Sequence, residues 1–236
     1  MGTLIGFVTD SLEWLYQLTV QINMPSYALA IVLLTIIIKV LLYPLTYKQM
    51  KSMKVMQQLQ PIIKELDQKY KNNPQKKQEE MMKVYQEYGA NPMAGCLPLL
   101  IQFPILIALF RGLQSFHPSI PEHYNFFWIN DLSLADPSGF ILPVFVGLTT
   151  FLQQYITSPN SNDPTQKMML YAMPILFGWM TRSFPAGLAL YWIAFSVVGT
   201  IQQIFINRGI KPTPVEDTAK DKNKKKHLPV KESEKK

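Results

Sequence analysis

The run from Tyr27 to Pro44 constrains the fold more than any other part of the chain, because it is long and apolar enough to cross a bilayer. Its single charged side chain is Lys39. A lysine near the bilayer centre costs about 2.5–3.5 kcal/mol on insertion scales, so its ammonium needs a compensating environment. Either the side chain extends past Pro44 to the lipid headgroups, or it lies in a polar cavity inside a helix bundle. Intramembrane charges usually face a bundle interior, which favours the cavity.

Four further segments are apolar enough to span a membrane, and we therefore predict an all-α membrane protein with five transmembrane helices. The predicted spans are residues 26–45, 93–115, 139–157, 168–184 and 186–207. Because only Pro185 separates the fourth span from the fifth, these two are expected to form a tight hairpin.

The positive charges are concentrated in two blocks. Of the 23 lysines and arginines, all but four lie within residues 48–83 or 208–236, whereas residues 116–138 contain none. Lysine and arginine mark the cytoplasmic side of a membrane protein. Both blocks and the short loop at 158–167 are thus predicted to be cytoplasmic, and the 116–138 loop extracytoplasmic. Five spans then place the N-terminus outside and the C-terminus inside.

Residues 46–92, between the first two spans, are too long and too polar for a simple turn. Apolar residues recur at helical spacing on both sides of the breaker Asn72-Asn73-Pro74, which predicts a cytoplasmic helical hairpin. The periodic residues are Met50, Met53, Met56, Leu59, Ile62, Ile63 and Leu66, followed by Met81, Met82, Val84 and Tyr85. A stripe at this spacing is usually the seam between two helices. Its methionines also suit a soft surface that binds apolar partners, which is the alternative.

The two ends of the chain differ in character. Residues 1–25 carry apolar side chains at helical spacing, which predicts an amphipathic helix along the outer membrane surface. These apolar residues are Leu4, Ile5, Val8, Leu12, Leu15, Leu18 and Ile22. No basic residue precedes them, so the segment is a poor signal peptide, with a cleaved signal as the alternative. Residues 208–236 lack periodicity and are predicted to form a disordered basic cytoplasmic tail. The run Lys222–Lys226 favours polyanions, either anionic lipid or RNA, without sequence-specific recognition.

The composition argues against a bound cofactor. Cys96 is the only cysteine, which excludes an internal disulfide and a metal site built from cysteines. The three histidines are scattered, and no glycine loop that would cradle a phosphate is present. We therefore expect no metal, no cofactor and no catalytic residues.

Polar side chains and prolines gather inside the predicted spans. Thr35 precedes Lys39 by one turn and shares its helix face. The other polar residues are Gln102, Gln153, Gln154, Ser196, Thr200, Gln202 and Gln203, and the prolines are Pro98, Pro104, Pro143 and Pro174. Hydrogen bonds between helices, worth about 0.6 kcal/mol each, explain many such residues. They do not explain Lys39, because no Asp or Glu lies inside any span to pair with it. The sequence therefore predicts a hydrated, positively charged recess that opens to the cytoplasm.

Three stretches of the chain resemble one known family, the YidC membrane protein insertases with their mitochondrial and chloroplast relatives. The first is KVLLYPLTYKQMKSMKVMQQLQP at residues 39–61, and the second is NPMAGCLPLLIQFPI at residues 91–105. The third comprises FPAGLALYWI at 184–193 and TIQQIFINRG at 200–209. The resemblance covers essentially all of residues 27–209, in the order that the family has.

The resemblance implies a five-helix core around a hydrophilic groove that is open to cytoplasm and lipid and closed on the outer side. It implies that Lys39 projects into this groove, at the position where most bacterial members have arginine, with Thr35 and Gln102 lining it. Tyr191 and Trp192 resemble an aromatic pair on the surface along which a client helix slides. Lysine keeps the charge of arginine but lacks the guanidinium fork that binds a carboxylate bidentately.

The function implied is that of a non-enzymatic insertase and chaperone in the bacterial plasma membrane, which inserts client membrane proteins and helps them fold. The implied partners are nascent membrane protein clients, the Sec translocon, anionic lipids, and the ribosome through the basic tail. The chain looks like a minimal form, without a large extracytoplasmic domain.

Two other classes of function compete with this interpretation. An ion or solute transporter would use Lys39 in a midplane site and would have equally broken helices. Against it, the sequence has no visible inverted repeat and no acidic coupling residue in a span. A membrane-embedded enzyme would need a dyad such as Ser196 with Lys39, whose separation the sequence leaves open.

Overall fold

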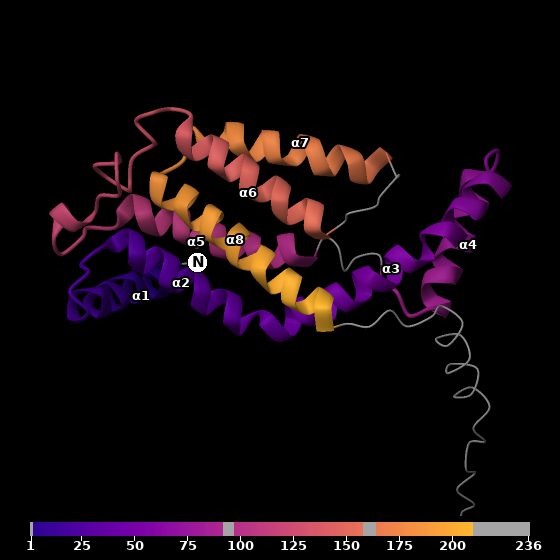
Figure 1. Ribbon diagram of the computed structural model, residues 1–236, viewed down its shortest axis with the longest axis horizontal. Helices are drawn as coiled ribbons and strands as arrows, with labels where there is room; N and C mark the ends of the chain where they lie inside the picture. Colours follow the sequence, from indigo (N-terminus) through magenta and orange to yellow (C-terminus); the bar gives the residue numbers. More distant parts are fainter. Residues whose placement is uncertain (1, 92–96, 158–163, 210–236) are drawn as a thin grey trace, which may run out of the picture. The chain divides into compact units, whose positions relative to one another are not determined.

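The computed structural model describes residues 2–91, 97–157 and 164–209 (Figure 1). Within these ranges the chain forms eight α-helices and no β-strand, so the predicted all-α class is confirmed for the described part. The chain divides into two compact units. We call residues 1–44 with 99–207 the core unit, and residues 45–98 with 208–236 the hairpin unit.

Helix α2 (Tyr27–Leu41) carries the charged residue of the first apolar run. It begins after Ser26, whose Oγ accepts a hydrogen bond from the backbone N–H of Leu29. It ends before the predicted boundary at residue 45, and α3 (Tyr43–Lys69) starts almost at once. Pro44 explains the break, because its nitrogen cannot donate to the carbonyl four residues back, whereas the first turn of a helix tolerates proline.

Helix α1 (Gly2–Gln21) packs along α2. Leu12 and Leu15 are buried in the hydrophobic core, and the ring of Tyr16 stacks on that of Tyr27 with centroids 3.9 Å apart. Much of the apolar face that the sequence assigns to the membrane surface is therefore used in packing within the core unit. Phe7 and Trp14 are the large apolar residues that this helix leaves most exposed.

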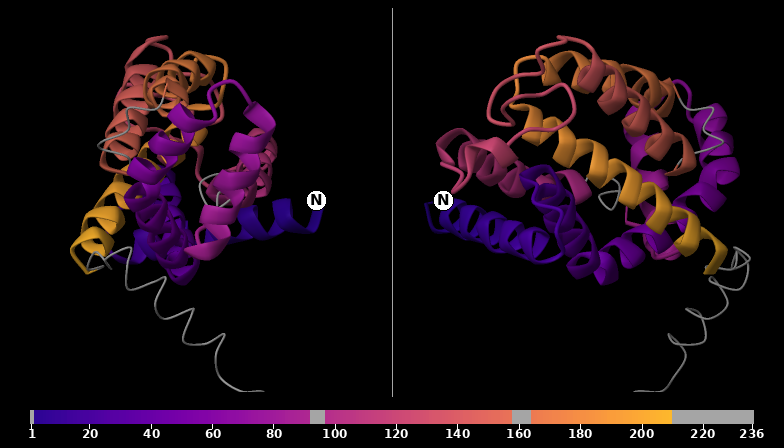
Figure 2. Two further views of the ribbon diagram at one scale, coloured as in Figure 1. Left: turned by 90° about the vertical axis from the view of Figure 1, so that its right-hand side faces the viewer. Right: turned by 60° about the vertical axis from the view of Figure 1, so that its left-hand side comes forward.

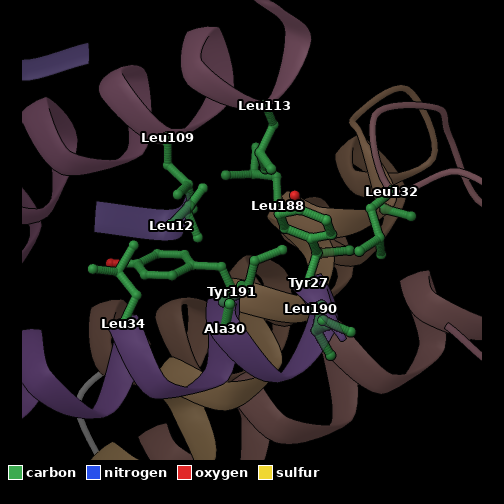
Figure 3. Close-up of a cluster of buried hydrophobic side chains, with 14 of the residues drawn as sticks. Leu12, Tyr27, Ala30, Leu34, Leu109, Leu113, Leu132, Leu188, Leu190 and Tyr191 are labelled. Carbon is green, nitrogen blue, oxygen red and sulfur yellow. The ribbon is translucent and has the colours of Figure 1, made fainter. Parts of the chain in front are cut away.

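Helix α8 (Ala186–Gly209) crosses between α2 and the pair α6 (Ile141–Thr157) and α7 (Pro164–Thr181), as Figures 1 and 2 both show. Its side chains reach three neighbours. They hydrogen-bond to α2, to α6 and to α5 (Leu97–Ser115). The core lies where α1, α2, α5 and α8 meet, and Figure 3 shows leucines and two tyrosines of these helices pointing toward one another.

Two glycines let α6 and α7 approach closely. A Cβ atom added at Gly178 would lie 2.8 Å from the carbonyl oxygen of Pro143, and one added at Gly147 would lie 3.2 Å from that of Pro174. Both contacts are with backbone atoms, which cannot rotate away. Glycine therefore permits this close packing, and the need for it is stricter at Gly178 than at Gly147.

The 116–138 loop is folded onto the end of the core unit at which α8 begins. Leu132 is fully buried, and the carbonyl oxygens of Leu132 and Leu134 accept hydrogen bonds from the backbone N–H groups of Gly187 and Ala186. The loop backbone thus satisfies the first N–H groups of α8, which have no partner inside the helix.

Asp136 holds the last part of this loop together. Its carboxylate accepts hydrogen bonds from Trp128, Ser138 and the backbone N–H of Leu142. Burial pushes the pKa of this carboxyl upward, but the hydrogen bonds outweigh burial and hold the pKa below its ordinary value.

The hairpin unit contains α3 and α4 (Pro74–Glu87), joined by the turn that the breaker predicts. The side chain of Asn73 accepts a hydrogen bond from the backbone N–H of Lys76 and so caps α4. Leu59 and Ile63 are buried against Val84 and other residues of the second helix, which confirms the seam at these positions. Met50 and Met53 lie outside this small core.

Some helices of the core unit are shorter than the roughly 20 residues of a typical membrane span, and α8 is longer. Helix α8 has 24 residues and is long and apolar enough to cross a membrane by itself, and α2 with α3 meets the same criteria as a broken pair. Helix α2 alone has 15 residues, and α6 has 17. Several predicted features lie outside the described residues. They are Cys96, the first six residues of the 158–167 loop, and tail residues 210–236 with Lys222–Lys226.

Candidate functional site: a buried lysine over an aromatic ring

Lys39 lies in the last turn of α2 and is only 5% exposed. Its side chain is turned inward to α8, because Nζ lies 3.3 Å from the centroid of the Phe195 ring. The alternative in which Lys39 extends to the headgroups therefore does not describe this structure. The ammonium therefore lies against an aromatic face.

The ammonium has no carboxylate partner among the described residues. The ion pairs Lys77–Asp67 and Lys83–Glu80 both lie in the hairpin unit. A cation over an aromatic face is worth about 0.5–1 kcal/mol when exposed and about 2 kcal/mol or more when desolvated. This contact offsets only part of the cost of burying a lysine.

The backbone around Lys39 is also tied to α8. The side-chain amide of Gln202 donates to the carbonyl oxygen of Lys39 at 3.1 Å. That carbonyl belongs to the last turn of α2, where the helix offers no partner. The side-chain oxygens of Gln202 and Gln203 are buried and have no hydrogen-bond partner in the described part of the chain.

Thr35 lies one turn before Lys39 on the same buried face of α2, as the spacing predicts. Its hydroxyl donates to the carbonyl oxygen of Ile31 at 2.7 Å, so its proton is used within the helix. The oxygen of this hydroxyl can still accept a hydrogen bond.

Gln102 and Tyr191 meet in the interior of the core unit. The amide of Gln102 donates to the hydroxyl of Tyr191 at 2.7 Å, and both residues are buried. Tyr191 also lies beside Phe195, with ring centroids 5.8 Å apart. A continuous path of contacts therefore links Lys39, Phe195, Tyr191 and Gln102.

Trp192 points away from this path. Its indole N–H donates to the hydroxyl of Thr150 on α6 at 3.0 Å, and its ring lies 4.5 Å from that of Phe177 on α7. The two aromatic residues that the resemblance pairs thus face different neighbours. Tyr191 is fully buried, whereas Trp192 is half-buried.

Sequence reasoning did not single out Phe195. The signal was present, because Tyr191, Phe195, Gly199 and Gln203 follow one another at intervals of four and so share a face of α8. An open apolar groove of about 680 Å³ lies elsewhere, between α6 and α7, and Lys39 is not among its lining residues.

Known proteins resemble the chain over most of its length. It is 42% identical over 200 residues to the membrane protein insertase YidC of Wolinella succinogenes, which covers 85% of this chain and 36% of that one. It is 43% identical over 185 residues to the YidC insertase of Geobacter sulfurreducens, which covers 78% of this chain and 34% of that one. The chain thus spans about a third of the length of these relatives.

A solved structure is also similar. The active YidC insertase crystal structure with the first transmembrane domain resolved matches with a TM-score of 0.65 and 27% identity, over 89% of this chain and 46% of that chain. The family described as 60Kd inner membrane protein matches residues 18–213. These findings confirm the likeness inferred from the three sequence stretches. Because the family match extends over most of its residues, this chain belongs to the 60Kd inner membrane protein family.

Proposed function

We propose that this chain is a non-enzymatic insertase and chaperone of the bacterial plasma membrane, which helps client membrane proteins to enter the bilayer and fold. The single observation that carries the proposal is Lys39, a cation that is 5% exposed and has no carboxylate partner among the described residues. Such a charge is costly in a membrane and is usually kept for function. The names of the YidC relatives support the same activity.

The proposed architecture has five spans, corresponding to α2, α5, α6, α7 and α8, with the amphipathic α1 at the outer surface. The lengths of α2, α5, α6 and α7 run from 15 to 19 residues. At 1.5 Å per residue these helices are about 22–28 Å long, shorter than the hydrocarbon core of about 30 Å. Short spans thin the bilayer around them. A thinner bilayer would shorten the path of a client's polar segment.

The proposed groove is lined by Lys39, Thr35 and Gln102, with Tyr191 and Trp192 at its apolar side, and it opens to the cytoplasm. Hydration near Lys39 is supported by the unpartnered side-chain oxygens of Gln202 and Gln203. An unpaired buried acceptor costs about 1–3 kcal/mol, and a bound water offsets that cost.

In the proposed mechanism, Lys39 attracts the carboxylates of a client's short acidic N-tail and replaces part of their hydration. The client's apolar helix then passes into lipid. This transfer releases about 0.8 kcal/mol per buried CH₂ group and so drives insertion without nucleotide hydrolysis. No covalent bond is made or broken in this scheme.

The proposed partners follow the positions of charge. Nascent membrane proteins are the clients, and the hairpin unit would capture them or regulate their access. The tail within residues 208–236 would contact the ribosome or anionic lipids, because its lysines attract polyanions. The Sec translocon is a further proposed partner. The proposed topology places the N-terminus outside and the C-terminus in the cytoplasm, following the positive charges.

Charge replacement at Lys39 tests the proposal in proteoliposomes with a single-span client that has an acidic N-tail. We expect Lys39→Arg to keep most insertion and Lys39→Gln to lose roughly tenfold, since about 1.4 kcal/mol of attraction corresponds to that factor. Lys39→Glu should lose more, because like charges repel. Lys51→Glu, on the exposed surface of α3, is the control with the same charge change.

Full insertion by the Lys39→Glu variant would refute the electrostatic role. A client-independent ion flux through wild-type proteoliposomes would instead favour the transporter interpretation. The same vesicles serve both measurements, so the two functions are separated within one preparation.

A further inference from the structure

One face of α8 forms a seat for the Lys39 ammonium. The residues of this face are Tyr191, Phe195, Gly199 and Gln203, which are spaced by four. The centroid of the Phe195 ring lies 3.3 Å from Nζ of Lys39. One turn earlier on the same face of α8, the fully buried Tyr191 packs beside Phe195. The ring is therefore held on one side while its π-face is presented to the ammonium.

Gly199 provides the space beside this ring. A Cβ atom added at Gly199 would lie 2.8 Å from Nζ of Lys39 and would also overlap the amide nitrogen of Gln153. Any larger residue at position 199 would push the ammonium, the Gln153 amide or both from their places. Because Gly199 has no side chain, the Lys39 ammonium and the Gln153 amide can both lie close to its Cα atom.

The chemistry of the seat suits a charge that is held and then released. A phenyl ring attracts a cation through its quadrupole, but it carries no formal charge. A carboxylate makes a charge-assisted hydrogen bond to an ammonium, which is a stronger interaction. An acidic group that reaches Lys39 can therefore draw the ammonium away from the ring, whereas a neutral group cannot.

We propose that Phe195 and Gly199 are positioning residues for Lys39, and that the Phe195 ring competes with the carboxylates of a client for the ammonium. The positioning role depends only on the geometry, and the competition with client carboxylates rests on the proposed insertase function. Together they make Phe195 a determinant of selectivity for acidic over neutral client tails.

The first experiment measures access to the ammonium without any client. Full-length protein in lipid nanodiscs is treated with formaldehyde and cyanoborohydride at fixed pH, and methylation of Lys39 is followed by mass spectrometry. A desolvated cation–π contact corresponds to roughly a 5- to 30-fold change in an equilibrium, so Phe195→Leu should raise the labelling rate by roughly that factor. Phe195→Tyr keeps a ring and should label like wild type.

Gly199→Ala should also raise labelling, since the added methyl group displaces the ammonium. Val197→Leu is the matched control, because Val197 is on the same helix and 42% exposed. Thermal unfolding of each variant reports on folding. If Gly199→Ala fails to fold, the two Phe195 variants still decide the question. If Lys39 is labelled at the wild-type rate in Phe195→Leu, the proposal that the Phe195 ring holds the ammonium is wrong.

The second experiment measures insertion of two clients that differ only in their N-tails, one with Asp and Glu and one with Asn and Gln in their place. Phe195→Leu should lower the client concentration for half-maximal insertion several-fold for the acidic tail alone, with the maximal rate unchanged. A merely structural role would alter both clients alike. Equal effects on both clients would overturn the competition, whereas a wild-type protein that inserts neither client would refute the insertase proposal itself.

Discussion

The close approach of α6 and α7 makes a graded prediction about glycine substitutions. Gly178→Ala would place a methyl group 2.8 Å from the Pro143 carbonyl oxygen, and Gly147→Ala would place one 3.2 Å from that of Pro174. At Gly112 the nearest atom is a side-chain methyl of Thr9 at 3.5 Å, and at Gly6 nothing lies within 4 Å. The four sites therefore form a series from severe overlap to open space.

The expected free energies combine two opposing effects. Alanine is favoured over glycine inside a helix by about 0.8–1.0 kcal/mol, and this gain applies at all four sites. Overpacking costs about 1–3 kcal/mol, and it applies in full only where the contacted atoms are backbone. Gly178→Ala should therefore be destabilising by up to about 2 kcal/mol, Gly147→Ala by less, and Gly6→Ala should be neutral or stabilising.

Thermal unfolding in detergent, followed by tryptophan fluorescence, measures the series. The unfolding temperatures should fall in the order Gly6→Ala, Gly112→Ala, Gly147→Ala and Gly178→Ala. The reasoning is refuted if Gly178→Ala unfolds at or above the temperature of Gly6→Ala. Such a result would mean that α6 and α7 are not held at the observed separation.

Three other predictions address different parts of the molecule. The hydrogen bond between Gln102 and Tyr191 should give a coupling free energy of about 1 kcal/mol in a double-mutant cycle of Gln102→Leu and Tyr191→Phe, and additive effects would contradict the observed contact. The Asp136 carboxyl has a pKa held below its ordinary value, so its contribution to stability is present above the ordinary pKa and is lost as the pH falls through the lowered one. Asp136→Asn should remove that part of the acid dependence, measured as unfolding temperature against pH, and an unchanged pH profile would contradict the role of the carboxylate. Replacing residues 65–83 by a short Gly/Ser linker should abolish insertion while the core unit unfolds at its wild-type temperature, because these residues belong to the separate hairpin unit; undiminished insertion would show that the hairpin is dispensable.

Proline and asparagine marked the helix ends that could be predicted from the sequence. The turn at Asn73-Pro74 and the start of α8 after Pro185 both occur where a residue cannot continue a helix or caps the next one. The early end of α2 was missed, although Pro44 causes it. The predicted boundary followed hydropathy, which does not register the loss of one backbone N–H group.

The surroundings of Lys39 were harder to predict. Its inward direction followed from the cost of a charge in lipid, and its place beside Thr35 followed from helical spacing. The Phe195 ring did not follow, because a contact between α2 and α8 joins residues far apart in the chain and depends on how the helices pack. Similarly, the burial of Tyr191 against Gln102 is set by the position of α5, which hydropathy leaves undetermined.

The way in which the 116–138 loop closes α8 has a consequence for how this region tolerates change. The N–H groups of Ala186 and Gly187 are satisfied by main-chain oxygens of the loop and not by a serine or aspartate side chain. A point substitution cannot delete a main-chain oxygen, whereas inserting or deleting a residue shifts it out of reach. Substitutions at exposed positions such as Leu134 should therefore change the stability of the protein very little. Small changes in loop length should instead break the hydrogen bonds to Ala186 and Gly187 and destabilise the start of α8. Spectroscopic probes are best introduced in this loop by replacement rather than by insertion.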